Sequence, residues 1–595
     1  MDARPAPARG AGPEPFAGRS AELAALAAQL RTAAPGPGCR VLLVAGRPGS
    51  GRSVLARRFA ATALGGRQLL TAHLADPDGT PQAPGAVARR LLGLLGLPTE
   101  ALPPAAAGQE DPACAELRTA LTGRDTLLLL DDVPDAEHLA PLLPEEPRCL
   151  VLAVSGGPLT ALAARFPVDP VILRGLDQAA AVDLLTTLVG GTRIGCDPVG
   201  AAGLAEACAE RPAPLRLMAG WLRAHPKAAV PEAVTALRGV AGESEPLAAA
   251  LQLRYQALPV AQARMLRMLT LAPGGRVDPR TASALAGCPG PEAVATLHAL
   301  AEQELLDPAE PAADGTARYR LPGRGFQRLL ALRELHDRPA AVQLARARLL
   351  ERLIRLTDSA RALLDPAVPA PDPLPGPLRL RGAEQARQWL AEERETLLDA
   401  AEQALDQADL DGSVGRLVGA LLRTLPLAGR PEQAGRLPAA EAYRLHTLVL
   451  ALAERQGAPR RAAAALLNLA DLRAAAGDPA AAAEHYQAAV AHTREPRDDA
   501  AAARALEGVG ECRRALGEAV RAADAYGRAL ALRQGLGDTA GQARLLTRLA
   551  EAHAAQRRFD EAVREYRAAL ALLRRLGDER AAGAVGRALE RLSAG

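Results

Sequence analysis

The sequence predicts a multidomain chain that opens with a parallel α/β domain, continues through helical and winged-helix domains, and ends in an all-α solenoid. Three observations predict this order. A glycine-rich loop lies between an apolar run and a helical pattern at 41–60, short apolar runs alternate with helical stretches over 41–155, and a 40-residue repeat occupies the last third. At 595 residues the chain is too long for one core, so we expect about three to five domains.

Composition restricts the class of protein. Apolar residues make up 49% and aromatic residues only 2%, so the cores must consist of Leu, Val and Ala. The net charge of +3 comes from interspersed positive and negative residues, which gives no electrostatic footprint for nucleic acid or a membrane surface. The seven cysteines are scattered without metal-ligand spacing and predict buried thiols in a reducing compartment.

The N-terminal sequence and the apolar runs predict the location. Residues 1–13 are rich in Pro, Ala and Gly, and we expect them to be disordered. They lack the apolar core of a signal peptide, and no run of about 18 apolar residues occurs in the chain. We therefore expect a cytoplasmic protein with no membrane partner.

The α/β prediction depends on four short apolar runs separated by helical patterns. A first helix follows Gly18, with Ser20 as its cap. The predicted strands are Val41–Val44, Gln68–Ala72, Thr126–Leu130 and Cys149–Val154. Alternation of this kind is typical of a parallel sheet with crossover helices.

A phosphate-binding loop follows the first predicted strand. It reads Gly-Arg-Pro-Gly-Ser-Gly-Arg-Ser and precedes a helical pattern, so the strand–loop–helix context of this motif is present. Its glycines let successive N–H groups converge on phosphate oxygens at the positive end of the helix. The predicted binding residues are Gly46, Arg47, Pro48, Gly49, Ser50, Gly51, Arg52, Ser53 and Val54.

Two residues of this loop have separate predicted roles. Ser53 stands where a hydroxyl would hold Mg²⁺. Arg52 replaces the lysine that would reach the β- and γ-phosphates, and its planar fork is bulkier and differently aimed than an ammonium. Two alternatives stay open: Arg52 supports a weakened ATPase, or hydrolysis is lost.

An acidic pair supplies the second half of the predicted nucleotide site. Asp131 and Asp132 directly follow the apolar run 126–130. A carboxylate at the carboxyl end of a buried strand can order Mg²⁺ and its waters, which is the role predicted for Asp131. Asp132 is the candidate base that orients or deprotonates water. The alternative is a solvated turn without ligands.

The middle of the chain predicts helices and a hairpin. Residues 173–235 have helical patterns, and a hairpin runs from Leu305 to Leu321. Helices combined with a hairpin predict a winged-helix unit over 236–338. No cluster of Lys and Arg occurs around 276–324, so direct DNA contact is not expected. A proline-rich stretch at 365–376 cannot continue a helix and predicts a long loop.

The last third contains an internal repeat. Tyr486, Tyr526 and Tyr566 recur every 40 residues and are three of the six tyrosines in the chain. Each unit holds two helical patterns joined near 477–478, 517–518 or 557–558. The repeat predicts a helical solenoid of at least three units, in which the tyrosines pack against neighbouring helices.

Beyond these patterns, residues 14–595 resemble the STAND ATPases of the NB-ARC type with tetratricopeptide repeats. More narrowly, they are similar to the ATPase–repeat region of actinobacterial antibiotic-regulatory (SARP-type) activators. The motifs that carry the resemblance are FAGRSAEL at 16–23, the phosphate loop, LLLLDDVPDAEHLAPLLP at 127–144, CAERPAPLRL at 208–217 and ARQWLAEERETLL at 386–398.

The resemblance implies a domain organisation. It predicts a P-loop NTPase (NB-ARC) domain at 14–172, a helical domain at 173–235, a winged-helix domain at 236–338, a helical linker with its proline-rich loop at 339–440 and a tetratricopeptide solenoid at 441–595. It also implies that Arg19 lies near the nucleotide and that Pro214 packs on the adenine.

The resemblance further implies a nucleotide switch. Exchange of ADP for ATP with Mg²⁺ would shift a closed monomer toward an open, oligomeric state, and the repeats would bind a protein partner or a small ligand. Three motifs depart from the family: Arg52 replaces the lysine, Gly156 the sensor arginine, and Pro322 with Gly323 the His-Asp motif.

These departures leave two hypotheses. The first is an ATP/ADP-binding signalling regulator of gene expression or secondary metabolism, in which nucleotide and ligand control a conformational switch. The alternative is a degenerate, non-hydrolysing nucleotide fold that serves as a scaffold for protein–protein interaction.

Overall fold

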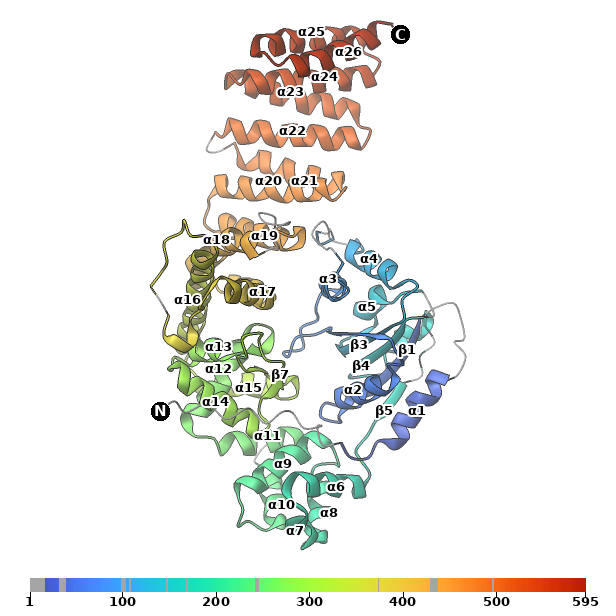
Figure 1. Ribbon diagram of the computed structural model, residues 1–595, viewed down its shortest axis with the longest axis vertical. Coiled ribbons are helices and arrows are strands. Elements are labelled where there is room, and N and C mark those ends of the chain that lie inside the picture. Colours follow the sequence, from blue (N-terminus) through green and yellow to red (C-terminus); the bar gives the residue numbers. More distant parts are fainter. Residues whose placement is uncertain are drawn as a thin grey trace. The chain divides into compact units, whose positions relative to one another are not determined.

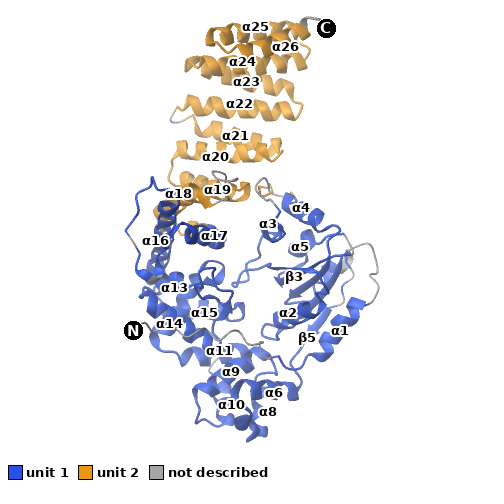
Figure 2. Cartoon of the chain, in the orientation of Figure 1, with its two compact units in different colours: residues 1–97, 110–400 blue, residues 98–109, 401–595 orange. Residues whose placement is uncertain are grey.

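The computed structural model divides the chain into two compact units, residues 1–97 with 110–400 and residues 98–109 with 401–595 (Figure 2). It describes residues 16–31, 39–97, 103–105, 109–145, 148–166, 168, 170–240, 245–372, 374–428, 437–494 and 497–594. The predicted disordered tail at 1–13 lies outside the described residues. Within the described residues, no helix is both long and apolar enough to cross a bilayer.

The first unit begins with a parallel sheet (Figure 1). Its strands lie in the order β2-β3-β4-β1-β5. Its strands are β1 Arg40–Gly46, β2 Gln68–His73, β3 Thr126–Val133, β4 Leu150–Ser155 and β5 Pro170–Leu173. The accompanying helices are α1 Ser20–Arg31, α2 Arg52–Ala63, α3 Pro84–Leu94, α4 Pro112–Leu121 and α5 Ala136–Leu139.

The strands form because they are nearly continuous apolar runs, as a parallel sheet covered on both faces requires. Alternate residues of β1, β3 and β4 pack with α1 and α2 around Leu26, Leu55 and Phe59 in one core. All four predicted strands are present, and β3 continues through both acids. The sequence did not predict β5, since it has four residues and begins with a proline.

A group of helices follows the sheet. They are α6 Gln178–Val189, α7 Gly191–Gly195, α8 Pro198–Ala207, α9 Pro212–Ala224 and α10 Val230–Arg238. Asp177 and Asp197 cap α6 and α8 by accepting hydrogen bonds from backbone N–H groups of the first turn. The helical prediction for this stretch is confirmed.

The next stretch, residues 246–336, combines helices with a small antiparallel sheet, and we call it the hairpin region. Its helices are α11 Pro246–Gln256, α12 Val260–Met268, α13 Pro279–Ala286, α14 Gly290–Glu302 and α15 Gly323–His336. Its strands, in the order β6-β8-β7, are β6 Arg276–Val277, β7 Asp307–Ala309 and β8 Arg318–Arg320. The predicted hairpin is β7–β8. The two-residue strand β6 carries no alternating pattern and was missed.

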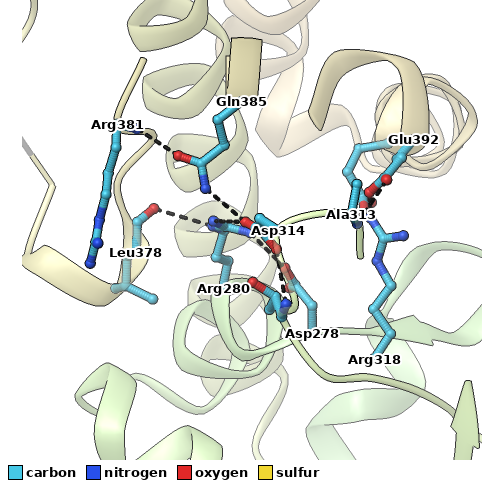
Figure 3. Close-up of polar contacts among 11 residues, drawn as sticks. Asp278, Arg280, Ala313, Asp314, Arg318, Leu378, Arg381, Gln385 and Glu392 are labelled. Carbon is cyan, nitrogen blue, oxygen red and sulfur yellow. Dashed lines mark hydrogen bonds and ion pairs between the residues drawn. The ribbon is translucent and has the colours of Figure 1, made fainter. Parts of the chain in front are cut away.

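Polar contacts hold the hairpin region to the segment that follows it (Figure 3). That segment contains α16 Pro339–Leu364 and α17 Ala383–Leu405, separated by the predicted proline-rich loop. Asp314, in the turn between β7 and β8, accepts a hydrogen bond from Gln385 at 2.8 Å and pairs with Arg280 at 3.4 Å. Arg318 of β8 pairs with Glu392 and Glu393 of α17 at 2.6 and 2.5 Å.

The second unit is a stack of helices, each packed on its sequence neighbours (Figure 1). They are α18 Asp411–Ala428, α19 Ala439–Arg455, α20 Pro459–Ala475, α21 Pro479–His492, α22 Asp499–Ala515, α23 Ala519–Gly535, α24 Thr539–Ala555, α25 Phe559–Leu576 and α26 Glu579–Ala594. The three predicted turns separate α20 from α21, α22 from α23 and α24 from α25. The solenoid prediction is confirmed.

The repeat tyrosines are packing residues. The ring of Tyr486 lies over Gly508, where a Cβ would be 2.5 Å from it, and the ring of Tyr526 lies over Gly510, where a Cβ would be 2.3 Å away. Tyr526 is fully buried. Glycines of α22 therefore allow the aromatic rings of α21 and α23 to pack directly against its backbone.

Candidate functional site

The glycine-rich loop turns the chain sharply from β1 into α2. Gly49 and Gly51 have φ angles of 82° and 89°, a left-handed conformation that glycine adopts without strain. The first N–H groups of α2 have no acceptor within the helix, and Gly51 offers no side chain to cap them. The positive end of α2 therefore opens into the loop, which is the geometry of an anion site.

Ser53 and Asp131, predicted as the magnesium pair, contact each other. The Ser53 hydroxyl donates a hydrogen bond to Oδ1 of Asp131 at 3.0 Å across 78 residues of sequence. The backbone N–H of Asp132 donates to the same oxygen at 2.9 Å, and Asp131 is buried. A hydroxyl and a carboxylate fixed beside an anion site are the oxygen ligands that Mg²⁺ takes next to phosphates, so this donor set fits the predicted ion.

Ser50 supplies a second sign of fit. Its side chain is buried, and its hydroxyl has no hydrogen-bond partner among the described residues. Buried hydroxyls in native proteins nearly always have a partner. A phosphate oxygen held in the loop would accept the missing hydrogen bond. The two remaining predicted side chains of the loop, Arg47 and Pro48, are exposed.

Arg52 folds back onto the loop. Its Nη1 donates to the carbonyl of Gly46 at 2.8 Å, and a Cβ added to Gly156 would lie 3.6 Å from the same nitrogen. Burial lowers the pKa of Arg52, while the nearby charges of Asp132 and Asp131 oppose this shift. The guanidinium thus lies between the loop and the end of β4, close to both acids.

The carboxylate of Asp132 contacts residues that the sequence did not predict. Its carboxylate accepts a hydrogen bond from Nδ1 of His73 at 3.0 Å, and Nη1 of Arg320 lies 2.6 Å from Nε2 of the same ring. Arginine can only donate, so Nε2 is the acceptor and Nδ1 carries the proton. Burial raises the pKa of Asp132, but the His73 hydrogen bond and the charges of Arg320 and Arg52 lower it more, so the net shift is downward.

His73 could be found only from the strand order. It ends β2 and pairs in register with Asp131 of β3. The two residues lie 58 positions apart in sequence, and no sequence motif links them. Ligand atoms of His73, Asp131 and Asp132 lie within 4.8 Å of one another.

Arg19 holds the backbone of the glycine-rich loop through a hydrogen bond to the carbonyl of Ser50. Its Nη2 donates to the carbonyls of Ser50 and Arg174 at 3.1 and 2.6 Å, and its Nη1 donates to Glu22 at 2.6 Å. The side chain is buried. The structure therefore places Arg19 against the backbone of the phosphate loop and the end of β5, where it ties the start of α1 to both.

The segment that contains Pro214 packs on the other side of the loop. The N–H of Ala213 donates to the carbonyl of Gly49 at 3.1 Å, and Arg211 donates to the carbonyl of Pro48 at 3.2 Å. A Cβ added to Gly49 would lie 3.1 Å from Ala213 and 3.7 Å from Pro214. The start of α9 thus brings Pro214 beside the predicted phosphate cradle, and the absent side chain of Gly49 permits this close approach.

Comparison with known proteins gave two curated relatives and a number of similar solved structures. The relatives are both named Regulatory protein AfsR. The one from Streptomyces griseus is 31% identical over 405 residues, which is 65% of this chain and 40% of the relative. The one from Streptomyces coelicolor is 28% identical over 404 residues, 62% of this chain and 40% of the relative. The chain thus spans about 40% of the length of the curated relatives it matches.

One of the similar solved structures is a STAND protein with a tetratricopeptide repeat sensor from Pyrococcus horikoshii. It is 14% identical, covers 96% of this chain and 85% of its own, and superimposes with a TM-score of 0.36. No protein-family model matches the chain. The two curated matches confirm the predicted resemblance: over about 65% of its length, this chain is similar to AfsR regulatory proteins.

Proposed function

We propose that the chain is a signalling regulator whose α/β domain binds ATP or ADP with Mg²⁺. The observation that carries the proposal is the 3.0 Å contact between Ser53 and Asp131 at the mouth of the glycine loop. It places a hydroxyl and a buried carboxylate beside the free N–H groups of α2, which is the arrangement a metal–polyphosphate needs.

Each predicted residue then has a role. The N–H groups of the loop 46–53 and of Val54 cradle the phosphates, and Ser53 with Asp131 holds Mg²⁺. Arg52 pairs with the phosphates after it leaves the Gly46 carbonyl. Arg19 fixes the backbone of the cradle, and Pro214 lies next to the base. Asp132 orients the water if hydrolysis occurs, with Mg²⁺ neutralising charge on the phosphates.

The solenoid supplies the sensor in this proposal. A protein partner or a small ligand binds the repeats, and its binding and the nucleotide together bias a two-state equilibrium of the chain. We further propose a cytoplasmic location, a nucleotide-dependent homo-oligomer and a role in gene expression or secondary metabolism. The similarity to AfsR regulatory proteins supports the regulatory part of this proposal.

Isothermal titration of the purified chain with MgADP and MgATP tests the proposal. We expect dissociation constants well below 1 mM, weakened at least tenfold by chelating Mg²⁺, by Asp131→Ala or by Ser53→Ala. The matched control is Asp135→Ala, since Asp135 lies on the same segment but caps α5. If neither nucleotide binds below millimolar concentration, the proposal fails.

A second function, a scaffold without turnover, is favoured by one observation. Arg52 donates to the backbone of its own loop rather than projecting from it. Measurement of phosphate release separates the two functions. Turnover that disappears in Asp131→Ala would exclude a bare scaffold, whereas tight nucleotide binding without turnover would support the non-hydrolysing alternative.

A further inference from the structure

The loop that follows His73 is a small folded element, and we call residues 74–82 the docking loop. It is closed by its own hydrogen bonds. The N–H of Asp76 donates to the carbonyl of Thr80 at 2.9 Å, and the N–H of Gln82 donates to the carbonyl of Leu74 at 2.8 Å. The side chain of Gln82 adds a bond to Asp76 at 2.8 Å. The loop is therefore a closed element that begins directly after His73.

The docking loop contacts the hairpin region at two glycines, Gly275 and Gly323. Pro77 lies against two glycines: a Cβ added to Gly275 would be 2.4 Å from its Cγ, and one added to Gly323 would be 3.3 Å from its carbonyl oxygen. Gln327 of α15 donates to the carbonyl of Asp78 at 2.8 Å. These contacts hold the loop against the start of β6 and the start of α15.

The same part of the hairpin region reaches the acidic pair. Arg320 ends β8, and the next residue, Leu321, donates its N–H to the carbonyl of Gly275 at 2.9 Å. Arg320 contacts Nε2 of His73, whose Nδ1 donates to Asp132. One end of β8 is thus linked to the phosphate site by two short contacts.

Asp132 combines an uncommon backbone conformation with a partly exposed side chain. Its φ is 54°, a left-handed conformation that is uncommon for residues other than glycine, although aspartate tolerates it better than most. Its side chain is 43% exposed, so packing fixes it only in part. The hydrogen bond from His73 is therefore the contact that determines where the carboxylate points.

We propose that His73 and Arg320 are positioning residues that let the hairpin region set the orientation of Asp132. While the docking loop and β8 are in place, the carboxylate is held beside the Ser53–Asp131 pair. When β8 moves, Arg320 releases the imidazole and Asp132 loses its orientation. The meaning of this coupling for nucleotide chemistry rests on the proposed function, but the coupling itself does not.

Two other readings of the cluster are weaker. The three ligand atoms of His73, Asp131 and Asp132 have the composition of a metal site. However, the Arg320 guanidinium contacts the imidazole, and the Nδ1 proton already bonds Asp132. The other alternative is an ordinary surface ion-pair network. Such a network would not explain why Pro77 packs against two glycines next to the end of β8.

Hydrogen exchange measured by mass spectrometry on the full chain without nucleotide tests the coupling. In Arg320→Ala we expect exchange to rise at least tenfold both in the docking loop and at 131–133 at the end of β3. Arg320→Lys keeps a donor and is expected to restore most of the protection. The matched control is Arg318→Ala, which removes an arginine from the same strand whose partners are on α17.

A double variant and a kinetic readout complete the test. His73→Ala and Arg320→Ala are expected to be non-additive at 131–133, since both break one chain of contacts. Where the wild type hydrolyses ATP, each variant is expected to lower kcat at least tenfold with little change in KM.

The outcomes separate this proposal from the proposed function. Unchanged exchange at 131–133 in Arg320→Ala, or an equal rise in Arg318→Ala, would overturn the coupling even if the chain binds nucleotide. Coupled exchange in a chain that binds no nucleotide would support the positioning role and reject the proposed function.

Discussion

At the residue scale, Arg52 shows why arginine and lysine would act differently in the proposed phosphate site. A lysine places a compact ammonium at the end of a flexible stem, whereas the planar guanidinium of Arg52 finds an acceptor in its own loop, the carbonyl of Gly46 at 2.8 Å. To pair with a phosphate, Arg52 must first give up that bond. A charge-assisted hydrogen bond is worth about 1.5–3 kcal/mol, which offsets much of what the new pairing would contribute.

Arg52→Lys is therefore expected to gain function. We expect affinity for MgATP, and phosphate release if it occurs, to rise about tenfold, equivalent to about 1.4 kcal/mol. Arg52→Ala should lower affinity because the cradle loses its cation. Titration and a phosphate-release assay on the three proteins check this. Equal affinities for MgATP in the lysine and alanine variants would show that the side chain at position 52 does not contact the phosphates.

The sequence placed Ser53 and Asp131 on the same side of one site, and the two side chains are in contact; their role in binding a nucleotide stays a prediction. This contact could be predicted because each residue occupies a fixed place after a buried strand, Ser53 in the glycine-rich loop motif and Asp131 in the acidic pair. His73 and Arg320 were not found, since their role depends on β2 lying beside β3 and on β8 reaching the end of β2. Such contacts arise only when elements far apart in sequence are assembled.

At the element scale, regular patterns predicted most of the structure. Continuous apolar runs predicted four strands, and the 40-residue period predicted the paired helices. The elements that were missed, β5 and β6, have four and two residues, too few for a pattern to show. Their strand character comes from pairing with β1 and β8.

The tyrosine–glycine contacts of the solenoid predict opposite effects for two similar substitutions. Gly510→Ala would place a Cβ 2.3 Å from the ring of Tyr526, and overpacking of this kind typically costs about 1–3 kcal/mol. Gly527→Ala lies in α23 with nothing within 4 Å of the added Cβ, so higher helix propensity should stabilise by about 0.5–1 kcal/mol. Thermal unfolding followed by circular dichroism should show transitions shifted in opposite directions. A Gly510→Ala variant as stable as the wild type would contradict the packing.

The contact between the hairpin turn and α17 predicts a dependence on pH. Burial raises the pKa of Asp314, but hydrogen bonds from Thr316 and Gln385 and the charge of Arg280 lower it more, to about 2. The contacts of Asp314 with Gln385 and Arg280 are drawn in Figure 3. Because the folded pKa lies below the ordinary value of 3.8, the ionised form stabilises the contact above about pH 4, and this stabilisation is lost as the pH falls toward 2.

Asp314→Asn should reproduce that loss at neutral pH. We expect a stability change on the order of 1–2 kcal/mol at this contact, seen as faster hydrogen exchange at the start of α17. Lowering the pH of the wild type from 5 to 3 should accelerate the same amides, after correction for the intrinsic rates, and the variant should not respond further. A wild-type-like variant would show that Asp314 does not hold α17.

At the scale of the whole molecule, the chain joins two units stabilised in different ways. The first unit has a sheet core with contacts between residues far apart in sequence, and the second is a stack in which each helix packs mainly on its sequence neighbours. The order of these parts could be predicted because each carries its own signature, a strand–loop–helix motif or a period. The boundary between the two units near residue 400 could not be predicted, because it falls inside α17, whose helical pattern is continuous.

This organisation predicts that nucleotide stabilises only one part of the chain. A ligand that binds a folded unit at 100 times its dissociation constant stabilises that unit by about 2.7 kcal/mol, and stacked helices with local contacts gain nothing from it. In scanning calorimetry of the full chain, MgADP should therefore raise the temperature of one unfolding transition and leave that of the other unchanged. Asp131→Ala should abolish the shift. The transition that moves should be unaffected by Gly510→Ala, which acts in the second unit. If both transitions shift together with MgADP, the two units unfold as one cooperative body, and stability in the solenoid must then depend on the phosphate site.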